Sequence, residues 1–347
     1  MKRSEMFRVL VIIALMVGGC AALDSPDAVA PPADRIGEDK PVWPAGPEPP
    51  RIHYVGRITG ASDLGVTRSL VRRLGEAFAG ASAEQFVRPA GVAAAGELLA
   101  VADPGAPALF LLDREAGRFR KITQANGEDL ISPVGVAIGE GQAVYLSDSY
   151  LRRIYVYDAD GRFRAVFGED TFARPTALAF DRQRRRLYVA DTGAHQVVAL
   201  DDQGKNLFTL GGHGTGDGEF NWPGHICVTP DGSLLVVDSL NFRVQIFDAD
   251  GTFRSKFGRH GDGSGDFSRP KGIGVDSHGH VYVADNLFDT VQVFSRTGAF
   301  LLGFGRQGEG RGEFWLPVGL AVDTHDRIYV ADSYNKRLQI FEYVGGE

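Results

Sequence analysis

The chain has 347 residues, of which 44% are hydrophobic, 23% charged and 10% aromatic. This length and apolar content suffice for a sizeable buried core and exclude an intrinsically disordered protein. The 44 acidic residues outnumber the 37 basic ones and give a net charge of −7, which argues against nucleic acid as a partner. Two cysteines cannot form a disulfide framework.

The first residues have the pattern of a targeting segment. Basic residues precede an apolar run, residues 9–17, which is too short to cross a bilayer because a helical span needs about 20 residues. Two glycines then stand directly before Cys20. This Val-Gly-Gly-Cys ending resembles a bacterial lipobox, in which the cysteine is lipidated and becomes the mature N-terminus. We therefore predict a lipoprotein signal peptide over residues 1–19 and a lipid, palmitate included, on Cys20; an ordinary signal peptide or a short anchor is the alternative.

The segment after the cysteine predicts an extended tether in the cell envelope. The lipobox resemblance implies a sorting rule in which aspartate after the cysteine retains the protein at the inner membrane. Ala21 at that position favours the outer membrane. Residues 20–50 hold eight of the 17 prolines and six acidic residues, a composition that does not build a core. We expect Trp43 to pack at the edge of the folded domain that follows.

A repeat organises the rest of the chain. Units begin near residues 89, 133, 175, 223, 270 and 317, so successive starts lie 42 to 48 residues apart. Each unit starts with a proline and carries, 14 to 16 residues later, an aspartate that ends a segment similar to Tyr-Val-Ala-Asp. These anchor aspartates are Asp103, Asp148, Asp191, Asp238, Asp285 and Asp332. Two landmarks that keep the same phase in six units predict six copies of one structural element.

Each unit predicts four strands. In the fifth unit they are residues 271–276, 281–284, 291–294 and 299–304. The first three strands are apolar on both faces, which is typical of a sheet covered on both sides. The outer strand of the fourth unit, residues 253–257, alternates apolar and charged residues, as an exposed edge strand does. Four-stranded units of this length predict the blades of a β-propeller.

The ends of the repeat region predict how the ring closes. The sixth unit stops after its third strand, residues 337–341, and lacks an outer strand. Residues 51–58 read as a strand that precedes the first unit and has no partner of its own. We expect this strand to complete the last blade, because closure removes the open edges of the ring. The sequence thus predicts an all-β, six-bladed propeller over residues 51–345.

The repeat also resembles a known family. Glycine-rich linkers at 211–220, 258–267 and 305–314, together with segments similar to Tyr-Val-Ala-Asp-Ser-x-Asn-x-Arg, resemble NHL repeats. The resemblance covers residues 133–345 well, and the first unit is degenerate. It implies a six-bladed propeller that usually serves as a binding platform and occasionally as an enzyme.

The anchor aspartates predict a structural role. One aspartate at the same strand position in every blade is typical of a carboxylate that accepts backbone N–H groups from the following loop. A ring of metal-binding carboxylates is the alternative. An arginine stands five residues after three of the aspartates, and we expect it either to pair with its aspartate or to link neighbouring blades: Arg153, Arg243 and Arg337.

An enzymatic function is the first alternative to binding. The resemblance includes a peptidylglycine amidating-lyase branch, which holds a zinc ion through histidines from separate blades. At the position two residues after each repeat proline, this sequence has one histidine, His225, beside glycines and an alanine. A catalytic zinc takes three protein ligands. We therefore predict no catalytic residues, metal or cofactor; a lyase or lactonase with a metal in the channel remains the alternative.

The loops after the anchor aspartates predict a binding face. They open on the same side of a propeller as the inter-blade linkers, and they carry aromatic and cationic side chains, the usual composition of a recognition patch. The candidates are Tyr150, Arg152, His195, His225, Phe242, Phe288, Tyr334 and Lys336. We predict a non-catalytic platform for a protein or polysaccharide partner in the envelope, held to the membrane by its lipid; a purely architectural role is the second alternative.

Overall fold

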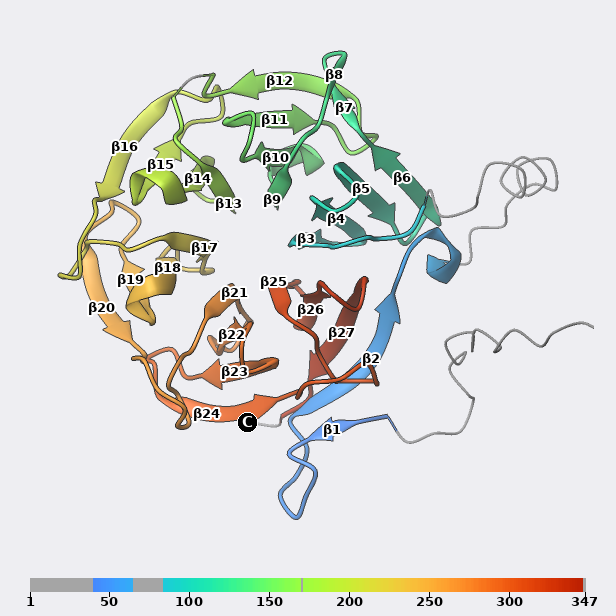
Figure 1. The fold of residues 1–347 in the computed structure, drawn as a ribbon, viewed down its shortest axis with the longest axis vertical. Helices are drawn as coiled ribbons and strands as arrows, with labels where there is room; N and C mark the ends of the chain where they lie inside the picture. Colours follow the sequence, from blue (N-terminus) through green and yellow to red (C-terminus); the bar gives the residue numbers. More distant parts are fainter. Residues whose placement is uncertain (1–39, 65–83, 170, 346–347) are drawn as a thin grey trace, which may run out of the picture. The chain divides into compact units, whose positions relative to one another are not determined.

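The computed structural model describes residues 40–64, 84–169 and 171–345. In this part of the chain, five four-stranded sheets and one five-stranded sheet are arranged in a ring (Figure 1). The predicted six-bladed, all-β propeller is confirmed. The lipid-attachment residue Cys20 and the signal peptide lie outside the described residues.

Each blade is an antiparallel sheet, and its strands follow one another from the channel outward. The strands are, in blade 1, β3 (Gly91–Ala95), β4 (Leu98–Asp103), β5 (Ala108–Asp113) and β6 (Arg118–Ile122); in blade 2, β9 (Pro133–Ile138), β10 (Val144–Asp148), β11 (Arg153–Tyr157) and β12 (Phe163–Phe167); in blade 3, β13 (Pro175–Asp181), β14 (Arg186–Asp191), β15 (Gln196–Leu200) and β16 (Asn206–Gly211).

The second half of the ring repeats this order. Its strands are, in blade 4, β17 (Pro223–Val228), β18 (Leu234–Asp238), β19 (Arg243–Phe247) and β20 (Phe253–Phe257); in blade 5, β21 (Pro270–Val275), β22 (Val281–Asp285), β23 (Thr290–Phe294) and β24 (Phe300–Phe304); in blade 6, β25 (Pro317–Val322), β26 (Arg327–Asp332) and β27 (Arg337–Tyr343). The loops hold a small hairpin, β7 (Gln124–Ala125) and β8 (Glu128–Asp129), and the short 3-10 helices η1 (Ala61–Leu64), η2 (Glu140–Gln142), η3 (Thr192–Ala194) and η4 (Ser239–Asn241).

The core consists of the blade faces that meet. Every residue of β10, β18 and β22 is buried, because neighbouring blades cover both faces of these strands. The outer strands face solvent instead, and β20 exposes Arg254, Ser255 and Lys256 at its centre. The predicted contrast between apolar inner strands and charged outer strands is therefore confirmed.

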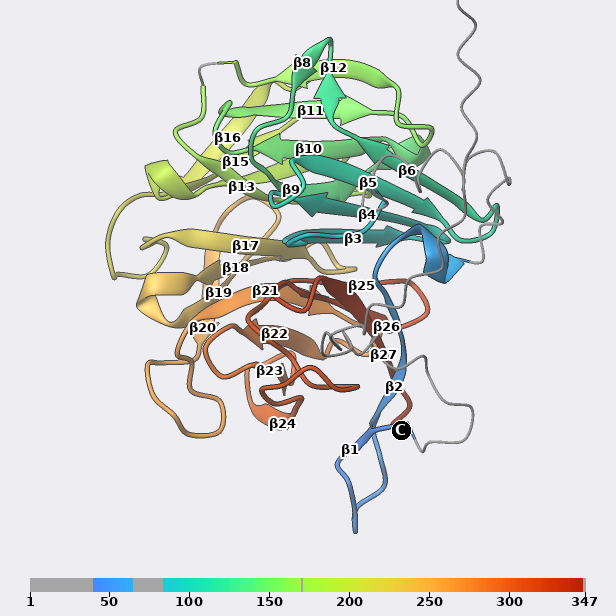
Figure 2. The same cartoon turned by 45° about the vertical axis from the view of Figure 1, so that its right-hand side comes forward.

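A strand that precedes the first repeat closes the ring, as the sequence predicted. β2 (Ile52–Ile58) lies antiparallel to β27 at the rim, and the pairing runs from Ile52 opposite Tyr343 to Ile58 opposite Leu338 (Figure 2). The expected tether extended to residue 50, whereas β1 (Val42–Trp43) already pairs with β2. A two-residue strand has no period that the sequence could reveal.

Trp43 packs against the hydrophobic core between blades 5 and 6. Its ring lies 5.7 Å from the ring of Phe304 and 5.8 Å from that of Phe341, measured between centroids. The expected position of Trp43 at the domain edge is confirmed. Blades 5 and 6 are thus held together partly by residues that precede the first repeat.

Candidate functional site

The anchor aspartates shape one face of the propeller. In blades 2 to 6 the repeat proline pairs with the anchor aspartate across the first two strands, for example Pro317 with Asp332, so both stand at the same end of the sheet. The carboxylate of Asp148 accepts backbone N–H groups from Ile131 and Ser132 before the proline and from Tyr150 and Leu151 after the strand. The predicted capping role is confirmed. We call this end of the propeller the loop face: the residues that precede the repeat prolines and those that follow the anchor aspartates.

Two of the three predicted arginine partners are present. Arg243 Nε donates to Asp238 at 2.8 Å, and Arg337 Nε donates to Asp332 at 2.7 Å, with all four side chains buried. Arg153 does not pair with Asp148. Its guanidinium reaches Glu128 at 3.2 Å and Glu169 at 3.6 Å. The four backbone N–H groups described above already occupy both oxygens of Asp148, so no acceptor remains for Arg153.

Exposed apolar side chains concentrate on the loop face. Of the eleven large apolar side chains that the described residues expose, eight stand close to a repeat proline or an anchor aspartate. They lie either one or two residues before the repeat proline or two residues after the anchor aspartate: Val87, Ile131, Trp222, Trp315, Tyr150, Leu240, Leu287 and Tyr334. An apolar set confined to one face, rather than scattered over the surface, is typical of an interaction site.

The candidate residues from the sequence divide into two groups. Tyr150, Tyr334 and Lys336 are exposed on the loop face, and Tyr150 has 72% of its surface accessible. Phe242 and Phe288 are half-buried, and the Phe242 ring lies 4.4 Å from that of His260. In blade 5 the exposed neighbour is Leu287, which the sequence analysis did not select.

Two further candidates occupy the turn after the anchor aspartate. Arg152 and His195 both adopt a positive φ, 56° and 55°, in the left-handed turn that several blades share. His195 Nδ1 accepts a hydrogen bond from the Trp222 backbone N–H at 3.2 Å. This bond links blade 3 to the linker of blade 4 and gives His195 a structural task on the loop face. A ligand-contacting role for the eight candidates stays a prediction.

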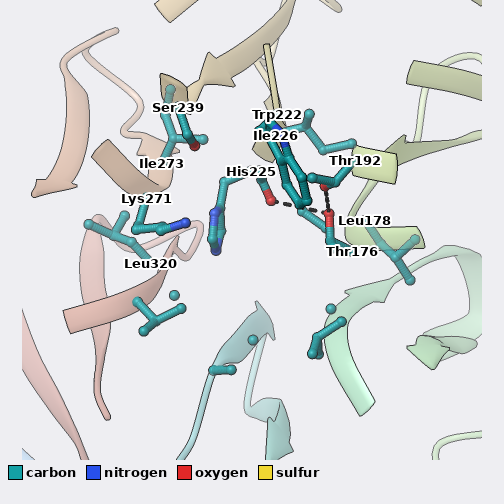
Figure 3. A pocket seen from close by; sticks show the side chains of 18 of the residues that line it. Thr176, Leu178, Thr192, Trp222, His225, Ile226, Ser239, Lys271, Ile273 and Leu320 are labelled. Atoms are coloured by element: carbon teal, nitrogen blue, oxygen red, sulfur yellow. Dashed lines mark hydrogen bonds between the residues drawn. The ribbon is translucent and has the colours of Figure 1, made fainter. Parts of the chain in front are cut away.

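The channel opens on the loop face as a cavity of about 460 Å³. Its wall consists of the first residues of the inner strands, and Trp222 and Leu240 connect it to the exposed apolar set. Figure 3 shows the His225 ring and the Lys271 side chain both reaching into the cavity. The predicted place of His225 in the channel is confirmed.

Hydrogen bonds between neighbouring blades hold the shape of this wall. Thr192 Oγ1 donates to the carbonyl of Pro223 at 2.6 Å, Ser239 Oγ donates to that of Pro270 at 3.2 Å, and Asn286 Nδ2 donates to that of Pro317 at 3.0 Å. Each donor directly follows its anchor aspartate and reaches the first residue of the next blade. The cavity is therefore preformed by bonds that repeat around the ring.

The cavity wall is cationic. The positively charged Arg174, Arg269 and Lys271 line it together with His225, and no acidic residue does so among the residues that the structure describes. The Arg174 guanidinium lies 5.6 Å above the ring of Trp222, which places the charge at the channel mouth. Burial, helped by Arg269 and Arg174, lowers the pKa of Lys271 to about 8. Burial and the nearby Lys271 lower the pKa of His225 to about 3, so this imidazole is neutral at pH 7.

His225 has an unmet hydrogen-bonding group. Its Nδ1 is inaccessible to solvent and has no partner within the described part of the chain. Unpaired buried polar groups cost stability and are uncommon in folded proteins. An imidazole and a lysine that face one another without an acceptor provide donors for an anionic group that enters the channel.

Sequence reasoning missed the cations beside His225. It compared the second position after each repeat proline, where His225 alone is polar. Lys271 stands at the first position, where the other units have Ala90, Val134, Thr176, Gly224 and Val318. Arg174 and Arg269 stand one residue before their prolines. Comparing all positions around the proline would have found them.

Replacing Lys271 by valine, the residue of blades 2 and 6 at this position, is expected to stabilise the protein at pH 7 by about 2–3 kcal/mol. A folded-state pKa of about 8, below the usual 10.5, means that the unfolded chain binds more protons between these pH values. Wild-type stability therefore rises with pH through this window, and the advantage of Lys271→Val shrinks as it does. Urea unfolding at pH 7 and pH 10.5 measures both values; an equal difference at the two pH values would contradict the lysine's desolvation.

Comparisons with known proteins agree with the fold. Residues 314–341 match the NHL repeat, and residues 221–287 match a family described as a 6-bladed β-propeller. The protein is a six-bladed NHL-repeat propeller. NHL repeat-containing protein 2 of Homo sapiens is 29% identical over 177 residues, which cover 48% of this chain and 21% of that protein. The Bos taurus protein of the same name is 34% identical over 86 residues, 22% of this chain and 12% of that protein.

This propeller also resembles solved structures with little sequence identity. A structure of streptogramin B lyase has a TM-score of 0.56 at 10% identity and covers 75% of this chain and 94% of the lyase. A Bacteroides thetaiotaomicron protein of unknown function has a TM-score of 0.60 at 17% identity and covers 83% of this chain and 75% of that one. At these identities the likeness shows the fold alone. This chain matches about an eighth to a fifth of the length of the curated NHL relatives.

In the described residues, no helix has the length and apolar character needed to span a membrane.

Proposed function

We propose that this NHL propeller is a lipid-anchored, non-catalytic binding platform of the bacterial cell envelope. Its loop face receives a protein partner, and the channel mouth takes up an anionic group of that partner. The observation that carries the proposal is a preformed cavity with four basic side chains and no acidic one among its described lining residues, surrounded by exposed apolar side chains.

The charge of the cavity supports an anionic group. Burying cations away from water without an anion is unfavourable, and the lowered pKa of Lys271 is the sign of that cost. The protein as a whole carries a net charge of −7, so this patch runs against the average charge of the surface. A carboxylate or phosphate in the channel would raise the pKa of Lys271 again and give His225 and the arginines a partner.

The apolar set around the cavity supports a protein as the partner. Trp222, Trp315, Tyr150 and Tyr334 are exposed aromatic side chains, the residue types enriched in the centres of protein interfaces. The rings of Trp315 and Tyr334 lie 5.7 Å apart and form one contact surface from two loops of blade 6. Aromatic anchors around a charged centre favour a folded or extended polypeptide over a polysaccharide.

The enzymatic alternative requires a metal in the channel. The donor set of the described channel lining is one imidazole with three positively charged side chains, which suits an anion better than a cation. The likeness to the lyase structures rests on the fold alone. We therefore place the binding function above a lyase or lactonase activity.

Replacing two exposed residues of the loop face is expected to abolish crosslinking to the partner. Leu287→Ala combined with Trp315→Ala removes apolar contacts, and we expect at least a tenfold lower yield of crosslinked complex in intact envelopes. Leu301→Ala is the matched control, because this leucine is 39% exposed, similar to 54% for Leu287, but stands on the outer strand β24. Mass spectrometry of the crosslinked species measures the yield. The same partners at undiminished yield in the double variant would refute the loop-face proposal.

Lipid anchoring is tested separately from binding. Cys20→Ser removes the thiol that carries the lipid, so we expect the full-length protein to move from the detergent phase to the aqueous phase in phase partitioning. Ala21→Ser, one residue further, serves as the control and is expected to stay in the detergent phase. Unchanged partitioning of Cys20→Ser would mean that another segment anchors the protein.

A further inference from the structure

Blade 5 carries a group of metal-binding side chains far from the loop face. The turn between β21 and β22 contains Asp276, His278 and His280. One possible ligand atom from each of these side chains lies within 4.8 Å of the other two. Because β21 begins at the loop face and ends at Val275, this turn stands at the opposite end of the blade.

The side chains of Asp276 and His280 are already oriented by their neighbours. Asp276 is buried, and its Oδ2 lies 2.8 Å from His280 Nδ1 and accepts a hydrogen bond of 2.8 Å from the Tyr282 hydroxyl. Asp276 Oδ1 also accepts hydrogen bonds from the backbone N–H groups of His278 and His280 in the same turn. Carboxylates that bind metal ions are commonly held in place by hydrogen bonds of this kind.

The equivalent turn of blade 6 lacks one of the possible metal ligands. Its equivalent residues are Asp323, His325, Arg327 and Tyr329. Arg327 Nε donates to Asp323 Oδ2 at 2.8 Å, and the Tyr329 hydroxyl donates to the same oxygen at 3.0 Å. Blade 6 therefore neutralises its buried carboxylate with a permanent cation. Blade 5 has the same carboxylate and tyrosine, but a histidine replaces the arginine.

We propose that Asp276, His278 and His280 bind one divalent ion of the Zn²⁺ class. Two imidazoles and one carboxylate suit Zn²⁺, Co²⁺ or Ni²⁺, whereas Ca²⁺ and Mg²⁺ prefer oxygen ligands. The ion supplies blade 5 with the positive charge that Arg327 supplies to blade 6. The ligand atoms must draw closer than 4.8 Å around an ion with bonds of about 2.1 Å, and the His278 side chain, 52% exposed, has solvent space in which to move toward the other two.

The bound ion would stiffen the junction of blades 5 and 6. Asp326 of blade 6 accepts the Ser277 backbone N–H at 2.8 Å and the Ser277 hydroxyl at 2.7 Å, and it lies 3.6 Å from His278 Nδ1. The Tyr343 ring, at the end of β27, lies 4.7 Å from that of His280. An ion held by this turn is thus linked, through Asp326 and Tyr343, to the blade that closes the ring. An ion that binds only the folded state raises the melting temperature.

The test is Co²⁺ and Zn²⁺ titration of the full-length protein after removal of metals with a chelator. We expect one equivalent of Co²⁺ to bind with a visible d–d absorption band, and Zn²⁺ to displace it. His280→Arg copies blade 6 and preserves the pair with Asp276, so this variant keeps its fold while losing a ligand. His278→Ala removes an exposed ligand. Each change is expected to weaken Co²⁺ binding at least tenfold and to abolish the rise in melting temperature on metal addition.

Two controls separate this site from other histidines. His325→Ala changes the equivalent position of blade 6, and His213→Ala changes a histidine whose ring lies 4.5 Å from that of His195. Both are expected to bind Co²⁺ as the wild type does. The proposal is overturned if the wild type binds no Co²⁺ at micromolar concentrations, if His278→Ala and His280→Arg bind it undiminished, or if either control variant loses it.

Discussion

Asp332→Ala is expected to lower the free energy of unfolding by about 3–5 kcal/mol. The buried carboxylate accepts the Trp315 backbone N–H at 2.8 Å, Arg337 Nε at 2.7 Å and Gln339 Nε2 at 3.0 Å. Arg337 is buried as well, and its other guanidinium nitrogens donate to backbone carbonyls of the preceding linker. Removing the carboxylate leaves this guanidinium without its counter-charge, and that unpaired cation accounts for most of the loss.

Urea unfolding of the purified variant and the wild type measures the loss. Asp262→Ala serves as the control, because Asp262 is exposed in an inter-blade linker and should change stability by less than about 0.5 kcal/mol. A loss below about 1 kcal/mol for Asp332→Ala would mean that the buried pair contributes little. The same variant should also weaken partner crosslinking, because the carboxylate positions Trp315 on the loop face.

The sequence predicted the fold well because each weak signal occurs six times. A single Pro-to-Asp spacing means little, but the same spacing in six units identifies the inner strand, the second strand and the turn after it. The closing role of residues 51–58 followed from counting strands in the last unit, and β2 confirms it. The capping role of the aspartates also follows from position alone, since any carboxylate at that strand end faces the same backbone groups.

Features that break the repeat were harder to predict. Lys271 is distinctive only beside the small or apolar residues that other blades have at its position, and the cavity it lines depends on how six inner strands converge. The failure of the Arg153 pairing has a similar cause: the sequence spacing matches that of Arg243 and Arg337, but the acceptors on Asp148 are already occupied. What a residue contacts depends on its competitors, which spacing does not show.

Both proposed sites are departures from an otherwise regular repeat. The loop-face cavity acquires its polar donors where blades 4 and 5 replace small or apolar residues by the neutral His225 and the cationic Lys271. The metal group acquires its second imidazole where blade 5 replaces the arginine of blade 6 by His280. A propeller needs only the shared positions for its stability, so substitutions in single blades are available for binding. The two sites lie at opposite ends of blade 5, and each can be changed without the other.

Ile52→Asp is expected to destabilise the propeller by more than about 4 kcal/mol, because it removes a buried aliphatic side chain and places an unpaired charge in the core. Ile52 is fully buried at the start of β2, in the cluster that contains Phe314 and Phe341. This strand is the one that closes the ring. Loosening it also exposes the edge of β27, so we expect aggregation at temperatures at which the wild type stays folded.

The neighbouring residue supplies the matched control. His53 follows Ile52 on the same strand, but its side chain points to the other face and is half-buried. His53→Asp introduces the same charge one residue away, and we expect it to cost less than about 1.5 kcal/mol. Thermal unfolding followed by circular dichroism, with light scattering to detect aggregates, compares the two variants. If both lose stability equally, the effect comes from charge on the strand rather than from opening the blade seam. A clear difference means that the ring depends on the segment that precedes its first repeat, because only burial against blades 5 and 6 distinguishes the two positions.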